Sequence, residues 1–85
     1  LAQQQRQTML EEAVGLRLID GEEADTFDGV HQALDDLMAE TGFRMQENNL
    51  PALLSVLVER GTTEQAEADD FQRIHDLLLE NGLMR

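Results

Sequence analysis

Two segments of the chain, centred on Phe27 and Phe71, carry nearly the same helical pattern 44 residues apart. Five residues recur at identical spacing and a sixth is matched conservatively: Ala24/Ala68, Asp25/Asp69, Phe27/Phe71, His31/His75, Leu34/Leu78 and Val30/Ile74. Their apolar members fall three and four residues apart, which places them on one face of an α-helix. Shared aspartate, phenylalanine and histidine favour an internal duplication, with two independently similar amphipathic helices as the alternative. Either way, each helix must bury one face.

Helical spacing also covers the rest of the chain, and its boundaries carry start and stop signals. Met9, Leu10, Ala13 and Val14 form an apolar stripe within residues 4–19, and no run alternates as a strand would. The boundary signals are Asp20 with Glu23 as a capping box, Gly42 as a left-handed cap, Pro51 in the first turn of a third helix and Thr62 with Gln65 as a second capping box.

These elements predict an all-α protein with one domain over residues 1–85. We expect two similar helical hairpins, 6–41 and 50–82, joined by a loop at 42–49 and followed by a tail at 83–85. Their apolar faces must cover each other, as a four-helix bundle or an orthogonal array. Phe43 and Met45 are expected to hold the loop against the core.

Charge and composition exclude several classes of function. The chain has 18 acidic residues against 6 basic ones, a net charge of −12, so direct binding to nucleic acid is not expected. It has no cysteine, lysine or tyrosine, which removes thiolate metal sites and lysine chemistry. Ser55 lies within a predicted helix and lacks a glycine elbow. No run is long enough to span a membrane. We expect a cytoplasmic, non-catalytic protein without a cofactor.

The two histidines lie on the apolar stripes, where the simplest interpretation is a packed imidazole with one nitrogen bonded to a carboxylate or carbonyl. The alternative is a metal-binding bundle that uses His31 and His75 with nearby aspartates. Asp28 and Asp35 stand three residues before and four residues after His31, a spacing found in carboxylate–histidine ligand pairs. The corresponding residue to Asp28 in the second segment is Gln72, which weakens this alternative.

The sequence favours a small acidic helical protein that acts by binding another protein, and a net charge of −12 predicts that this partner is basic. The candidate partner-binding residues share the polar helix faces: Asp25, Asp28, Asp35, Asp36, Asp69 and Asp76. A DNA mimic that inhibits a basic nucleic-acid-binding protein is a special case. Gly29, on the same polar face, admits close approach of a partner or is simply tolerated. Four further apolar residues exceed what a small core can hold and predict a homodimer: Leu16, Leu18, Ile19 and Val56.

Overall fold

A computed structural model describes residues 3–44, 46 and 48–84. These residues form four α-helices and no strand: α1 (Gln3–Gly15), α2 (Gly21–Thr41), α3 (Leu50–Glu59) and α4 (Gln65–Glu80). The prediction of an all-α fold is confirmed. The radius of gyration is 12.2 Å, close to the value of about 12 Å expected for a compact chain of this length. Within the described residues, no helix combines the length and the apolar character needed to cross a bilayer.

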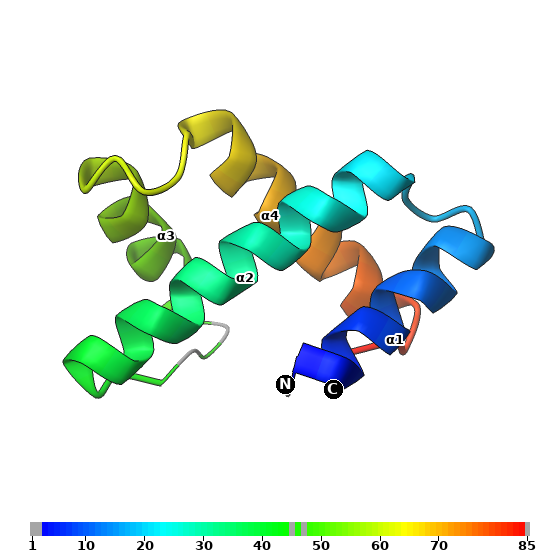
Figure 1. The fold of residues 1–85 in the computed structure, drawn as a ribbon, viewed down its shortest axis with the longest axis horizontal. Coiled ribbons are helices and arrows are strands. Elements are labelled where there is room, and N and C mark those ends of the chain that lie inside the picture. Colours follow the sequence, from blue (N-terminus) through cyan, green and yellow to red (C-terminus); the bar gives the residue numbers. More distant parts are fainter. Residues whose placement is uncertain (1–2, 45, 47, 85) are drawn as a thin grey trace.

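The long helix α2 is the centre of the arrangement, because it packs against each of the other three helices. Figure 1 shows α2 crossing α4, with α1 and α3 towards opposite ends of α2. Where the two helices cross, the rings of Phe27 and Phe71 stack with centroids 4.4 Å apart. Both phenylalanines are fully buried. The stripe of each repeated segment therefore faces the other.

Matched positions of the two repeated segments are buried to similar degrees. Leu34 and Leu78 are both fully buried, and His31 and His75 are 1% and 7% exposed. This equivalence is what a duplication would give, although two amphipathic helices that cross at their centres would bury the same positions. The internal repeat as an evolutionary event stays a prediction.

The local signals around α2 and α3 act as expected. Oδ1 of Asp20 accepts a hydrogen bond from the Glu23 amide at 2.8 Å, and Oε1 of Glu23 accepts one from the Asp20 amide at 3.1 Å. At the other end Gly42 adopts φ 79°, and its amide donates to the Met38 carbonyl. That left-handed conformation is easily reached only without a side chain. Pro51 lies in the first turn of α3.

The predicted cap of α4 is wrong. Its N-cap residue is Glu64, whose amide donates to Oε1 of Glu67 at 3.0 Å, so Thr62 and Gln65 do not form a capping box. Thr63 is only 5% exposed and its amide bonds back to the Leu57 carbonyl. The turn between α3 and α4 is thus folded against the protein, and α4 begins two residues later than a cap at Thr62 would place it.

The connection between α2 and α3 is held differently from the prediction. Phe43 is 65% exposed and does not anchor the loop in the core, while Met45 lies outside the described residues. Asn49 takes this role instead: its Oδ1 accepts from the Gln46 amide at 2.6 Å and its Nδ2 donates to the Arg44 carbonyl at 2.7 Å. Within the described part of this loop, a single amide side chain therefore closes the turn by hydrogen bonds.

Candidate functional site

A buried arginine connects α1 to α2. Arg6 is 1% exposed, and its Nε donates to Oδ1 of Asp28 at 2.6 Å. Its Nη1 lies 3.2 Å from Oδ2 of Asp35 and 3.0 Å from Nδ1 of His31, and its Nη2 donates to Oε1 of Gln32 at 3.4 Å. We call these five residues the Arg6 cluster. A buried guanidinium is tolerated only when carboxylates compensate its charge, as they do here.

The Arg6 cluster brings together three of the candidate metal ligands, His31, Asp28 and Asp35, but around a guanidinium. Among the described residues, no group of three or more histidine, aspartate or glutamate side chains is arranged to hold a metal ion. The fourth candidate, His75, belongs to α4 and packs against Phe71 with ring centroids 6.1 Å apart. Arg6 thus occupies the position that the metal-binding alternative gave to an ion. It also engages two of the aspartates expected to bind a partner.

Both imidazoles are packed in the core, as the simplest interpretation of the sequence expected, but the buried Nδ1 of His75 has no hydrogen-bond partner among the described residues. Nδ1 of His31 has two polar neighbours, Nη1 of Arg6 at 3.0 Å and Oδ2 of Asp35 at 3.3 Å. The guanidinium can only donate and the carboxylate can only accept, so the two contacts favour opposite tautomers of the ring. Nε2 has no hydrogen-bond partner within the described part of the chain. Burial lowers the pKa of His31 below its usual 6.5, Arg6 lowers this pKa further, and Asp35 opposes both effects. His31 is neutral in the folded protein near pH 7.

Because the pKa of His31 is lower in the folded state than in the unfolded state, we expect acid to destabilise the fold through this residue. As pH falls below 6.5, the unfolded chain takes up the proton more readily, so stability is lost progressively. Urea denaturation at a series of pH values between about 7.5 and 5 gives the free energy of unfolding of the wild type and of the variant His31→Gln. The difference in free energy of unfolding between the wild type and the variant should shrink as the pH falls. A difference that stays constant would contradict a lowered pKa of His31 in the folded protein.

A groove runs along α2 on the side that faces the α3–α4 turn. It has a volume of about 470 Å³. Four carboxylates line it, those of Asp25, Asp36, Glu40 and Glu67, together with one arginine, Arg60. Nη1 of Arg60 donates to Oε2 of Glu40 at 2.9 Å, and this bond lowers the pKa of Glu40. Among the described residues the lining of the groove is therefore net negative, and the one arginine in it is already paired with Glu40.

The wall of this groove on α2 contains Gly29, which is exposed. A Cβ atom built at Gly29 would have nothing within 4 Å, so packing inside the chain does not require glycine there. Glycine in the interior of a helix costs about 1 kcal/mol relative to alanine. Because Gly29 has no side chain, the backbone of α2 is uncovered at this point between Asp25 and Asp36.

The remaining predicted site residues are scattered. Asp69 and Asp76 are exposed on α4, where each accepts a hydrogen bond from a glutamine one turn earlier. Of the residues expected to bind a second copy, Ile19 is in the core at 5% exposure and Leu18 is half-buried, because the chain turns inward after α1 ends at Gly15. Leu16 is 59% exposed. Val56 lines an apolar pocket at the opposite end of α2.

Sequence reasoning missed Arg6 and Glu67. The signal for Arg6 was its spacing, since Arg6, Met9 and Ala13 share one helical face and all three are buried. For Glu67 the sequence shows only an acidic residue in the first turn of a helix, which indicates no binding site. Its position across the groove from α2 is a product of the tertiary fold.

Comparison of the chain with protein-family models, with curated proteins and with solved structures gave no match. What the protein does must therefore be inferred from its own residues and their geometry.

Proposed function

We propose that this protein is a non-catalytic binding module that holds a basic segment of another protein in the acidic groove of α2. The observation that carries the proposal is the lining of the groove, where four carboxylates surround one arginine that is itself paired. Negative charge concentrated in a concave site attracts cations more strongly than the same charge spread over a convex surface. Gly29 lets the backbone of a bound segment approach α2 closely.

The groove offers apolar contacts as well as charge, which suits a peptide better than a free cation. Val30, Ala33, Leu37 and Leu57 contribute to its lining. An arginine side chain matches this mixture, because its methylene stem packs on apolar surface while its guanidinium pairs with carboxylates. The expected ligand is therefore an arginine-rich segment whose charged groups reach Asp25 and Asp36 at the two sides of Gly29.

The test is calorimetric titration of a short arginine-rich peptide into wild-type protein, into Asp25→Asn/Asp36→Asn and into Asp69→Asn/Asp76→Asn. The two variants lose equal charge, but only the first loses it from the groove. We expect the groove variant to bind about tenfold more weakly, which corresponds to about 1.4 kcal/mol, and the control to change much less. Binding should also weaken as salt increases.

Two results would overturn the proposal. If both variants lose affinity equally, the peptide responds to net charge and the groove is not its site. If wild-type protein does not bind the peptide at low salt, a basic partner is excluded. The DNA-mimic alternative makes an additional prediction, namely that this protein competes with DNA for a DNA-binding protein.

A further inference from the structure

A second, chemically different surface lies at the C-terminal end of α2, where an apolar pocket opens between α2 and α3. Its volume is about 310 Å³. Seven of the described residues line it, and none of these seven is charged: Leu37, Thr41, Phe43, Asn49, Ala52, Leu53 and Val56. The acidic groove on the neighbouring side of α2 has four carboxylates in its lining. Whatever binds in this pocket is selected by apolar contact.

Phe43 makes this pocket unusual, because a large aromatic ring at its rim is 65% exposed. Gly42 turns the chain away from α2 in its left-handed conformation, and Asn49 fixes the following loop through the Arg44 carbonyl. The ring is thus presented on a short, hydrogen-bonded connection. Exposed aromatic residues beside apolar pockets are typical of the centres of protein interfaces.

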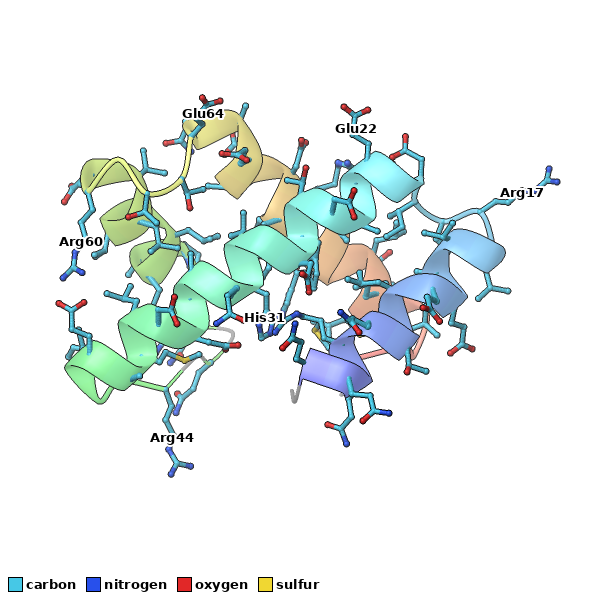
Figure 2. All side chains as sticks on the ribbon, in the orientation of Figure 1. Arg17, Glu22, His31, Arg44, Arg60 and Glu64 are labelled. Atoms are coloured by element: carbon cyan, nitrogen blue, oxygen red, sulfur yellow. The ribbon has the colours of Figure 1, made fainter. Side chains whose placement is uncertain are left out.

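The charge distribution identifies which partner fits. Residues 41–58 contain one arginine and one glutamate, so this stretch is neutral in a chain whose net charge is −12. A second copy of the chain would be repelled by the acidic faces and least repelled here. Arg44 is exposed, and its guanidinium has no carboxylate partner among the described residues; Figure 2 shows it projecting away from the helices. Glu59, which borders the stretch, is an exposed acid within the same surface that a neighbouring Arg44 can meet.

We infer that two copies of this protein associate through the surface around the apolar pocket between α2 and α3, with Phe43 of each copy packed into the pocket of the other. A two-fold axis makes such an exchange self-complementary, because each copy supplies both the ring and the pocket. This dimer leaves the acidic grooves of both copies free.

The experiment is light scattering with sedimentation equilibrium on wild-type protein and two variants, Phe43→Ser and Leu16→Ser. The wild type should show twice the chain mass of 9.6 kDa. Phe43→Ser should raise the dissociation constant about 30-fold or more, the scale of a central interface residue. Leu16→Ser removes an equally exposed apolar side chain from the end of α1 and should leave the dimer intact. Circular dichroism checks that both variants stay helical.

Salt separates this proposal from the proposed function. Screening should strengthen an association between two chains of −12, whereas it should weaken the binding of a basic peptide. Arg44→Glu should weaken the dimer, with the largest loss at low salt. A monomeric wild type at all concentrations and salt levels would overturn the inference. Retention of the dimer by Phe43→Ser, or its loss in Leu16→Ser, would do the same.

Discussion

Replacing Arg6 with alanine should lower the free energy of unfolding by about 3 kcal/mol. Removing one partner of a buried ion pair typically costs 3–5 kcal/mol, because the other charge loses its compensation. Here Asp28 and Asp35 both lose the guanidinium that pairs with them, and Nδ1 of His31 loses its contact with Nη1. The lower end of the range applies, since the two aspartate side chains are 36% and 34% exposed and water can partly solvate them.

The matched control for this prediction is Arg17→Ala, because it removes the same charge from an exposed residue. Its effect should stay within about 0.5 kcal/mol. Urea denaturation followed by circular dichroism, at one protein concentration, gives both values. A loss of about 3 kcal/mol is a large part of the 5–15 kcal/mol that stabilises a typical domain. Equal stability of the two variants would show that the Arg6 cluster contributes little to holding α1.

Phe71→Ala should be at least as damaging, with a loss of about 3–5 kcal/mol. The ring is fully buried, stacks on Phe27 at 4.4 Å and also packs against both imidazoles, with centroids 6.2 Å from His31 and 6.1 Å from His75. Truncation opens a cavity at the crossing of α2 and α4, where neighbouring rings cannot collapse easily. The expected result is a protein that is largely unfolded or melts far below the wild type.

The chain provides its own control for this substitution, since Phe43→Ala makes the same change at an exposed position. Its effect on the stability of a single copy should be within about 0.5 kcal/mol. The double variant Phe27→Ala/Phe71→Ala measures the coupling of the two rings, expected at about 0.5–1.5 kcal/mol. If Phe71→Ala cost no more than Phe43→Ala, the crossing of α2 and α4 would not be the centre of the core.

The local features of the fold could be predicted because each is decided within a few residues. The Asp20–Glu23 capping box and the Gly42 turn depend only on neighbouring backbone and on the absence of a side chain. The Arg6 cluster could not be predicted in the same way, since its ion pairs join residues 22 and 29 positions apart. Neutralising two aspartates by a distant arginine is a consequence of how α1 packs on α2.

Only one wall of the acidic groove could be predicted, because that wall depends on helical spacing alone. Helical spacing places Asp25 and Asp36 on one polar face of α2, and both line the groove. The opposite wall comes from Thr63 and Glu67, whose positions depend on the turn between α3 and α4. Phe43 shows the reverse error: an aromatic residue after a helix was expected to pack inward, but the hydrogen bonds of Asn49 already satisfy that loop.

The packing of α1, which rests mainly on α2, also sets the order in which the molecule opens. Detaching α1 exposes Met9, Leu10 and Ala13 and breaks the Arg6 cluster, yet it leaves the stacked rings between α2 and α4 in place. Such partial opening requires less free energy than global unfolding. Backbone amides of α1 should therefore exchange with solvent through this local event, while those at the α2–α4 crossing exchange only when the whole chain unfolds.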